Sequence, residues 1–475
     1  MPLILPSNSI SAGGYEVDNS LRFESSSTDH LSRSKSSSET STTIGTFSFW
    51  VKRCETGATT SIYSNEVENG NNRGLILITN TDNFYINNSV TGQSDRVLST
   101  TQLFRDLSAW SHFVVAFDTN QGTASNRVKI YHNGNQITAF GTAVYPNQSE
   151  NLKILEGGQT NKELVGKIYG ADNSRMYLAE FHHIDGQALT PTDFGEFDEN
   201  SGIWKPIEYS GTYGNNGFYL DFENSGSLGA DVSGNSNNFT VNNLTSIDQT
   251  TDTPTNNFCT FNSLVNVPYT TFSQGNTFVD LTSTGSSSHH TNYGNIAFSS
   301  GKWYWEAKAL GGTKYTIGLS DANNQSNYQQ VAGTNLIVGN HANSYVSGDA
   351  IGWYSTTLYK NGSTIASSLS GIVTNDIMMV AVDCDNGKIY FGKNGTWRVA
   401  NSTTFDSTQN DTTFTTGEFY VSAFSNEDCD WSVNWGNPAY SISSGNSDGN
   451  GYGNFEYSVP ENYYSLNVKN LAEFG

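Results

Sequence analysis

Short runs of apolar and aromatic residues, separated by turn signals, recur along most of the chain. A first series occupies residues 47–51, 75–78, 84–86, 110–117, 128–131 and 176–184, and a second series occupies residues 303–306, 315–319, 350–354, 377–382, 389–391 and 419–424. Asn133-Gly134, just after the run at 128–131, is a strong signal for a β-hairpin. No amphipathic helical pattern separates the runs of the second series, which favours antiparallel strands. The sequence therefore predicts an all-β protein made of antiparallel β-sandwiches.

Length and composition support this interpretation. A chain of 475 residues is too long for one sandwich, so we expect two domains. Aromatic residues make up 13% of the chain, charged residues only 14%, and 46 residues are glycine, which favours strands joined by tight turns. The net charge of −22 opposes binding to nucleic acid or to an anionic membrane surface. No stretch approaches the ~18 apolar residues of a membrane span, so we expect no membrane insertion.

Composition also changes along the chain. Residues 206–270 are rich in Asn, Ser, Thr and Asp, with only brief apolar pieces such as 218–220 and 239–241. Because a long structureless loop inside a compact protein is uncommon, we expect this segment to pack on one lobe. The sequence predicts a jelly roll at 1–205, a polar connector at 206–270, a second β-sandwich at 271–440 and a C-terminal tail at 441–475.

The cysteines and the N-terminal residues 1–6 indicate whether the protein matures in an oxidising, secretory compartment. Cys54, Cys259, Cys384 and Cys429 are widely spaced and form no CxxC pair, which argues against a disulfide scaffold or a zinc site. We expect thiols, with Cys384 and Cys429 in the same lobe. Residues 1–6 lack the basic segment and the length of a signal peptide, so we expect no standard secretory leader.

Two pairs of acidic residues have a spacing that suits catalysis. Asp221 with Glu223, and Glu66 with Glu68, would share one face of a strand. A retaining glycosidase needs two carboxyl groups about 5–5.5 Å apart. Neither pair has the E-x-D-x-x-E pattern of lectin-fold glucanases, and Asp221 and Glu223 lie beside turn-forming Asn and Gly. We therefore expect no catalytic residues and no enzymatic activity.

Three other patterns could suggest a metal site, namely His182-His183, His289-His290 and the VDCDNGK run at 382–388. Adjacent residues of a strand point to opposite faces, so His182 and His183 cannot bind one ion together. His289-His290 lies in a Ser-rich loop. The Asp-Asn-Gly of VDCDNGK favours a type I′ hairpin turn, and no Glu follows at the EF-hand spacing. We expect no metal and no cofactor.

Aromatic side chains could stack on sugar rings. Trp303, Trp305 and Trp353 occupy strand positions that favour a place in the core. Tyr359 and Trp397 lie beside Asn-Gly turns, where we expect exposed rings that could bind a ligand. Tyr359 and Trp397 are therefore the candidate ligand-binding residues.

The two series of strands resemble two known families. Residues of about 15–200 resemble a laminin-G-like, concanavalin A-like jelly roll, on the pieces FSFWVKR (47–53), WSHFVVAFD (110–118), VKIYHNGNQI (128–137) and AEFHHIDGQALT (179–190). Residues of about 272–440 resemble a SPRY domain, on GKWYWEAKA (301–309), IGLSD (317–321), GDAIGWY (348–354), MVAVDCDNGKIYFGKNG (379–395) and VNWGNPAY (433–440). Both families are concanavalin A-like sandwiches. The resemblance implies two antiparallel jelly rolls joined by a polar connector.

The connector and the tail are similar to segments of bacteriophage virion proteins, especially those of marine phages. The similar segments are residues 219–244, 252–258 and 464–475. This resemblance implies a virion protein, such as a tail fibre, spike or head decoration, that acts in host adsorption. It implies contacts with other virion proteins and with a host-surface glycan or receptor. It also implies a homo-oligomer, trimers being common in fibres, although the chain has no heptad or collagen-like repeat.

Three other functions stay open at this point. The first is a purely structural virion subunit that binds no glycan. The second is a glycoside hydrolase that degrades the host envelope. The third is a bacterial adhesin, which would need a leader or an anchor.

Overall fold

In the computed structural model, the chain is described at residues 14–35, 38–67, 72–156, 161–168, 170, 174–265, 270–281, 290–324, 338–339 and 348–475. It divides into two units between Asn256 and Asn257, called the first and the second unit below. Apart from one short α-helix and two 3-10 turns, η1 (Ala124–Asn126) and η2 (Pro191–Asp193), the regular elements of the described ranges are strands. The prediction of an all-β protein with antiparallel sheets is confirmed.

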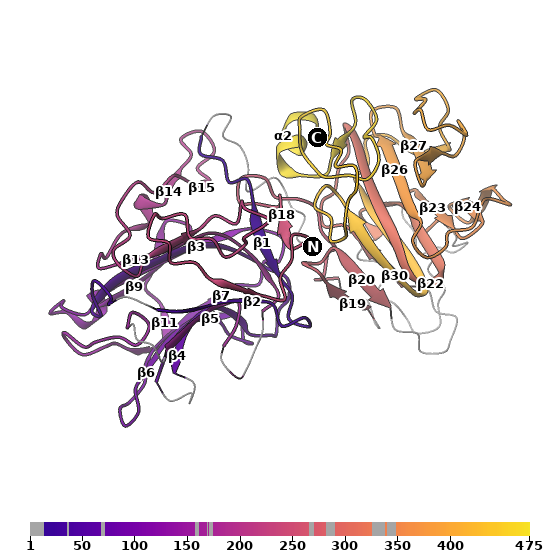
Figure 1. The fold of residues 1–475 in the computed structure, drawn as a ribbon. Coiled ribbons are helices and arrows are strands. Elements are labelled where there is room, and N and C mark those ends of the chain that lie inside the picture. The colour runs from indigo at the N-terminus through magenta and orange to yellow at the C-terminus, as the bar shows by residue number, and fades with distance from the viewer. Residues whose placement is uncertain are drawn as a thin grey trace. The chain divides into compact units, whose positions relative to one another are not determined.

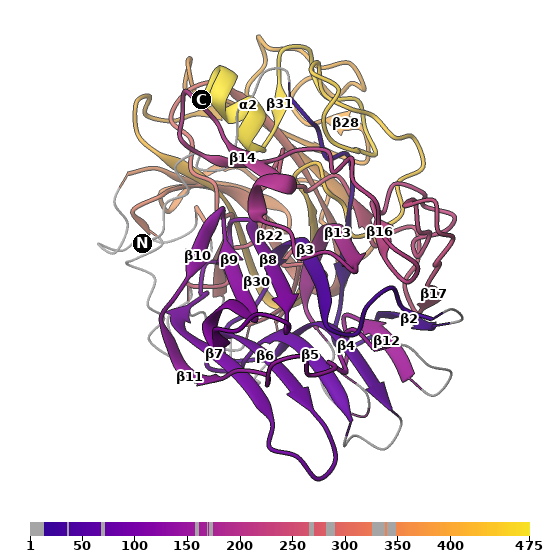
Figure 2. The same cartoon turned by 90° about the vertical axis from the view of Figure 1, so that its left-hand side faces the viewer.

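Two large sheets form the first unit (Figure 1). In order across sheet A, the strands are β10 (Asn135–Ile137), β9 (Val128–His132), β8 (Ser111–Asp118), β3 (Ile44–Arg53), β13 (Met176–Asp185), β1 (Ser20–Phe23) and β18 (Gln249–Thr250), with β16 (Phe218–Leu220) beside β13. In order across sheet B, they are β11 (Phe140–Val144), β7 (Arg96–Leu103), β6 (Asn83–Ser89), β5 (Arg73–Ile78), β4 (Thr60–Val67), β12 (Asn161–Val165), β2 (His30–Ser34) and β17 (Thr240–Asn242). Figure 2 shows the strands of sheet B side by side.

The core of the first unit lies between these sheets. Alternate residues of β3, namely Phe47, Phe49 and Val51, point into it, as the pattern of this run predicts. The other side of β3 is buried as well, because Trp50 belongs to a second cluster of buried apolar side chains, which includes Trp204. Trp204 belongs to β15 (Trp204–Pro206), which pairs with β14 (Gly195–Phe197).

The segment predicted as a connector is built into the first unit as far as Asn256. Strand β16 pairs with β13, β17 pairs with β2, and β18 pairs with β1. The segment therefore adds strands to both sheets. The division between the units falls inside the predicted connector 206–270, not at either end of it.

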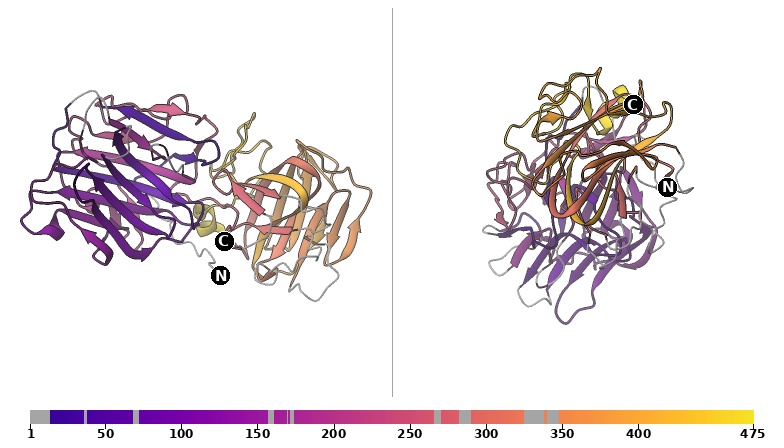
Figure 3. Two further views of the ribbon diagram at one scale, coloured as in Figure 1. Left: turned by 90° about the horizontal axis from the view of Figure 1, so that it is seen from below. Right: turned by 90° about the vertical axis from the view of Figure 1, so that its right-hand side faces the viewer.

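One large sheet forms the second unit, in the pink-to-yellow part of Figure 3. Its main path runs through β19 (Thr270–Ser273), β20 (Phe278–Leu281), β30 (Tyr420–Asn434), β22 (Lys302–Asp321), β23 (Ala350–Tyr354), β24 (Thr357–Lys360) and β25 (Ser363–Ala366). Strands β21 (His290–Tyr293), β26 (Ile377–Asp383), β27 (Lys388–Lys393), β28 (Thr396–Trp397), β29 (Thr412–Thr413) and β31 (Tyr464–Ser465) attach to this path. The two runs predicted at 303–306 and 315–319 lie on one strand, β22.

The tail at 441–475 belongs to the second unit. Leu466 is completely buried in its core, and β31 pairs with β22. The tail ends in α2 (Val468–Phe474), whose first turn is capped by Asn467: its side chain accepts a hydrogen bond from the Asn470 N–H. Trp303, Trp305 and Trp353 are buried, as predicted.

Three hairpins carry the Asn-Gly pairs at 133–134, 361–362 and 394–395. Both residues of each pair have a positive φ, as a type I′ turn requires. The VDCDNGK hairpin differs, and the predicted type I′ turn is wrong there. Four residues separate β26 from β27, and of these only Gly387 has a positive φ, of 60°. Asp383 closes this longer turn by accepting the Asn386 N–H at 3.0 Å.

Candidate ligand-binding site

A pocket of about 310 Å³ opens on the outer face of sheet B in the first unit. Its walls come from three neighbouring strands, β17, β2 and β12, and from residues that follow β12. Strand β2 explains why polar groups face the pocket. Leu31 is buried in the core, so by alternation His30, Ser32 and Ser34 lie on the opposite face.

The strand register sets these side chains in rows. Ser32 lies opposite Leu164 of β12 on one side and opposite Thr240 of β17 on the other. His30 lies opposite Asn242, whose amide nitrogen donates to the Ser32 hydroxyl at 3.0 Å. The pocket therefore combines hydroxyl and amide groups with one apolar patch, at Leu164.

Lysine side chains give the pocket positive charge, and a histidine lies among them. Lys162 comes from β12, Lys167 follows that strand, and His30 comes from β2. Burial lowers the pKa of His30, and nearby Lys167 lowers it further, against the opposing effect of the bond to Thr28. His30 Nδ1 donates to the Thr28 carbonyl at 2.8 Å, which orients the ring. Among the described residues that line the pocket, none is Asp or Glu.

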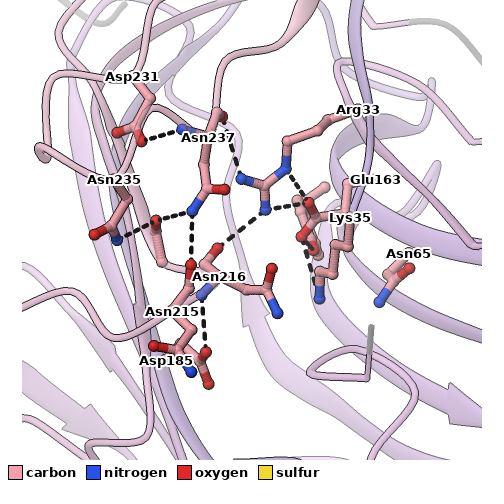
Figure 4. Close-up of polar contacts among 12 residues, drawn as sticks. Arg33, Lys35, Asn65, Glu163, Asp185, Asn215, Asn216, Asp231, Asn235 and Asn237 are labelled. Atoms are coloured by element: carbon pink, nitrogen blue, oxygen red, sulfur yellow. Dashed lines mark hydrogen bonds and ion pairs between the residues drawn. The ribbon is translucent and has the colours of Figure 1, made fainter. Parts of the chain in front are cut away.

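An ion cluster, drawn in Figure 4, lies on the inner side of the same strands, and its Arg33 also belongs to the pocket lining. Arg33 of β2 donates from Nε to Glu163 of β12 at 2.6 Å, and its Nη2 makes a second contact with that carboxylate. Lys35 lies 3.3 Å from the other oxygen of Glu163, and the Tyr63 hydroxyl donates to that oxygen at 2.6 Å. All four side chains are buried. Buried charges of this kind need paired partners, and here the pairing is complete around Glu163.

The pKa of Glu163 reflects this balance. Burial raises the pKa of a carboxyl group, but Lys35 and Arg33, with help from His183 and Tyr63, outweigh burial and hold it at about 2. Glu163 is therefore charged over the whole range in which the protein would normally act. It fixes Arg33 and Lys35 on the inner faces of the strands whose outer faces line the pocket.

Arg33 also holds the segment that leads to β17. Its guanidinium donates to the carbonyls of Asn216 at 3.0 Å and Asn237 at 3.2 Å, as Figure 4 shows. Asn237 Nδ2 in turn donates to the Asn215 carbonyl at 3.0 Å, and Asp231 accepts the Asn237 N–H at 2.7 Å. This network ties an Asn-rich loop to the sandwich just before the chain enters β17. It thus positions one wall of the pocket.

Neither aromatic residue predicted to bind a ligand lies at this pocket, because both belong to the second unit. Tyr359 is half-buried on β24, beside the hairpin at 361–362. Trp397 is only 4% exposed, so the prediction that its ring is exposed is wrong. Its ring packs at 4.9 Å from Phe405, in a cluster that includes Tyr304, because the chain folds back over the hairpin.

The acidic pairs do not have the expected strand geometry. Strand β16 ends at Leu220, and Asp221 accepts the Glu223 N–H at 3.2 Å in a turn. Phe222 between them has φ 61°, which breaks the alternation that would place both carboxyl groups on one face. Burial raises the pKa of Asp221. In the other pair, Glu66 lies on β4 and Glu68 falls outside the described residues.

The histidine pair on β13 behaves as predicted. His182 stacks on Tyr219 at 4.2 Å on the outer side of sheet A, and His183 stacks on Phe47 at 4.3 Å in the core. In the other pair, His290 is buried on β21 and His289 falls outside the described residues. Over the described ranges, no three His, Cys, Asp or Glu side chains form a group that could hold a metal ion. Within the same ranges, no helix has the length and apolar character needed to cross a membrane.

Sequence patterns do not reveal the pocket, because its strands are short and polar. Strand β2 reads HLSRS and β12 reads NKELV, so neither stands out as an apolar run. A weak signal does exist in β2. His30, Ser32 and Ser34 alternate with Leu31 and Arg33, which is the pattern of a strand with one wet face.

Comparison with known proteins agrees with the two sandwiches. The family model described as the concanavalin A-like lectin/glucanases superfamily matches residues 25–172, and the SPRY domain model matches residues 302–438. No curated protein matches the chain.

Solved structures give distant similarities. Domains LG4-5 of the mouse laminin alpha1 chain are 11% identical, with 95% of this chain and 99% of that chain covered and a TM-score of 0.29. The SPRY domain of human HERC1 is 17% identical, with 33% and 86% covered and a TM-score of 0.22. A putative carbohydrate binding protein from Bacteroides ovatus is 14% identical, with 48% and 59% covered and a TM-score of 0.31. From the two family models, the chain carries a laminin G-like domain of the concanavalin A-like superfamily, followed by a SPRY domain.

Proposed function

We propose that this protein is a lectin-like binding protein whose first unit holds a glycan in the pocket formed by β17, β2 and β12. The observation that carries the proposal is the pocket itself, at about 310 Å³. Ligand sites of ~300–1,000 Å³ are typical for small molecules, so this volume suits one or two sugar rings.

The chemistry of the walls supports a sugar ligand. The hydroxyls of Ser32, Ser34 and Thr240 can each donate and accept, as sugar hydroxyls do. The superfamily of the first unit includes lectins by its description, which adds support.

The same superfamily includes glucanases, but binding without hydrolysis fits the pocket better. Hydrolysis of a glycosidic bond commonly needs a pair of carboxyl groups, one on each side of the bond. The described lining residues supply none, and Asp221 and Glu223 are held in a turn.

We further propose that the protein acts in a bacteriophage virion, as a tail fibre, spike or head decoration in host adsorption. Support comes from the resemblance of residues 219–244, 252–258 and 464–475 to segments of such proteins. The partners would be other virion proteins, further copies of this chain in a homo-oligomer such as a trimer, and a host-surface glycan. Mass spectrometry and antibody labelling of purified particles test the location, and absence from the particle would contradict it.

Glycan binding is tested with the full-length chain on a glycan array. Ser32→Trp places a large ring on the floor of the pocket and should abolish binding. Thr142→Trp adds the same ring at an exposed position of β11 in the same sheet and should leave binding unchanged. If the wild-type chain binds no glycan or host cell, the protein is better explained as a purely structural subunit.

A further inference from the structure

We infer that the pocket selects glycans that carry an acidic group, a carboxylate or a sulfate ester, held between Lys167 and His30. This inference rests on the proposed glycan-binding function and names the class of ligand.

The charge of the pocket is opposite to that of the whole chain. The chain has 45 acidic and 23 basic residues, so a patch of average composition would carry about two acids for each base. By the same count, the described lining instead contains three basic residues, Arg33, Lys162 and Lys167, and no Asp or Glu. A basic pocket in an acidic protein attracts anions locally while the rest of the surface repels them.

The basic groups converge from different strands. Lys167 lies close enough to His30 to lower its pKa, which means that the two groups repel each other when both are charged. An anion between them would remove this repulsion and gain a charge-assisted hydrogen bond from the lysine. The bond from His30 Nδ1 to Thr28 directs Nε2 away from that carbonyl, so Nε2 is the ring atom left for a ligand. Nε2 donates to an anion only when the ring is protonated, a state that an anion bound beside it favours.

Lys162 contributes less positive charge to the pocket than Lys167 does. It lies opposite Glu66 of β4 on the same face of sheet B, and that carboxylate offsets its charge. The inference therefore depends on Lys167 and His30.

The ion cluster behind the pocket adds to its positive potential. Arg33 and Lys35 are two cations that share the single carboxylate of Glu163. All three are buried, so solvent screens their net positive charge poorly. A ligand anion on the outer face of β2 and β12 would be stabilised by this charge.

The test is calorimetric titration of the full-length chain with three oligosaccharides of one backbone: neutral, carboxylated and sulfated. We expect at least one acidic form to bind at least about tenfold more tightly than the neutral form, as one charge-assisted hydrogen bond allows. Lys167→Ala should remove this preference, so that the acidic and neutral forms bind with equal affinity. Lys129→Ala, on β9 of sheet A, is the matched control and should change nothing.

The outcomes separate this inference from the proposed function. Equal binding of neutral and acidic forms, or a preference that survives Lys167→Ala, would overturn the acidic selectivity while glycan binding stands. Failure of all three forms, together with a glycan array without hits, would remove glycan binding itself.

Discussion

Arg33 of β2 and Glu163 of β12 form an ion pair on the inner face of these strands, next to the core. The outer face of the same two strands lines the pocket. The Arg33 side chain also lies 5.2 Å from the ring of Phe218 and 5.0 Å from that of Phe239, so it packs as well as pairs. Lys35 would still pair with Glu163 in a variant without Arg33. The carbonyls of Asn216 and Asn237 would lose their donor, and a buried acceptor left unpaired costs about 1–3 kcal/mol.

We predict that Arg33→Ala lowers the free energy of unfolding of the first unit by about 3–5 kcal/mol, through these unpaired carbonyls and the lost packing on Phe218 and Phe239. Arg105 provides the control, because it pairs with Asp82 at 2.8 Å but its side chain is 61% exposed. Arg105→Ala should cost less than about 1 kcal/mol. Urea denaturation followed by circular dichroism measures both. An equal decrease in the free energy of unfolding for the two variants would show that the buried cluster stabilises the unit no more than an exposed ion pair does.

His112 shows how a buried polar network fixes a protonation state. The Trp204 indole N–H donates to His112 Nδ1 at 3.0 Å, so Nδ1 must be the unprotonated nitrogen. Nε2 therefore carries the proton and donates to the Ser48 hydroxyl at 2.9 Å. Burial lowers the pKa of His112 to about 3, and protonation would place two N–H groups against each other.

Glu306 in the second unit is the opposite case. It is buried on β22, and its carboxyl group accepts the Tyr304 hydroxyl at 2.8 Å and the backbone N–H groups of Glu456 and Tyr457 at 2.9 and 2.8 Å. These bonds fasten the C-terminal tail. Burial outweighs them and raises the pKa of Glu306 to about 7.

At the scale of elements, the three Asn-Gly hairpins share one device. The backbone N–H of Asn361 donates to the Ala350 carbonyl at 3.0 Å, and its side-chain oxygen accepts the Ala350 N–H at 2.8 Å. Asn133 makes the same two bonds with His112, and Asn394 makes them with Ile377. The asparagine side chain thus extends the ladder of the neighbouring strand by one step.

We predict that Asn361→Ala destabilises the second unit more than Asn361→Gly. Both variants lose the side-chain bond to Ala350 and the 2.7 Å bond from Nδ2 to Asp349, at about 1 kcal/mol each. Only alanine also carries the strain of a φ of 48°, about 1–2 kcal/mol, which glycine tolerates. Chemical denaturation of the two variants measures the difference. A larger loss for the glycine variant would contradict a role for backbone strain.

Sequence patterns predicted the elements whose side chains alternate strongly or that end in Asn-Gly. They did not predict that residues 302–321 form one strand, because Gly311 and Gly312 have the composition of a turn. The strand continues there because β30 pairs along its length, with a shift of register between Ala309 and Gly311. That pairing is a tertiary effect that local propensity does not contain.

The candidate site was harder to predict for the same reason. Strands β2, β12 and β17 are polar, and residues about 130 to 210 positions apart in the chain meet there. The prediction that Trp397 is exposed failed because a later segment, at Phe405, covers its ring. Hairpin chemistry is local and could be predicted, whereas burial and long-range pairing depend on the whole fold.

At the scale of the whole molecule, each unit has its own sheets and its own core. Sheets A and B lie in the first unit, and the large sheet that contains β22 and β30 lies in the second. The two largest clusters of buried apolar side chains are divided in the same way. We therefore expect two unfolding transitions, because each unit can lose its core without breaking the sheets of the other.

Buried titratable groups give the two units opposite responses to acid. In the first unit, burial lowers the pKa of His112 and of His183 to about 3. The unfolded chain binds protons on these histidines below pH ~6.5 and the folded unit does not, so stability falls as the pH falls. In the second unit, the raised pKa of Glu306 means that the folded unit binds a proton before the unfolded chain does. Its stability therefore rises as the pH falls from 7 towards 4.5.

We predict that lowering the pH from 8 to 5 moves the two calorimetric transitions in opposite directions. At pH 5, His112 and His183 each lower the free energy of unfolding of the first unit by about 2 kcal/mol. Glu306 raises that of the second unit by up to about 3 kcal/mol. Arg33→Ala identifies the transition of the first unit. His112→Gln should weaken the pH response of that transition alone, and Glu306→Gln should weaken the response of the other alone. A single transition at every pH, or two that shift together, would contradict the independence of the units, since a shared unfolding step would average the opposing proton linkages into one curve.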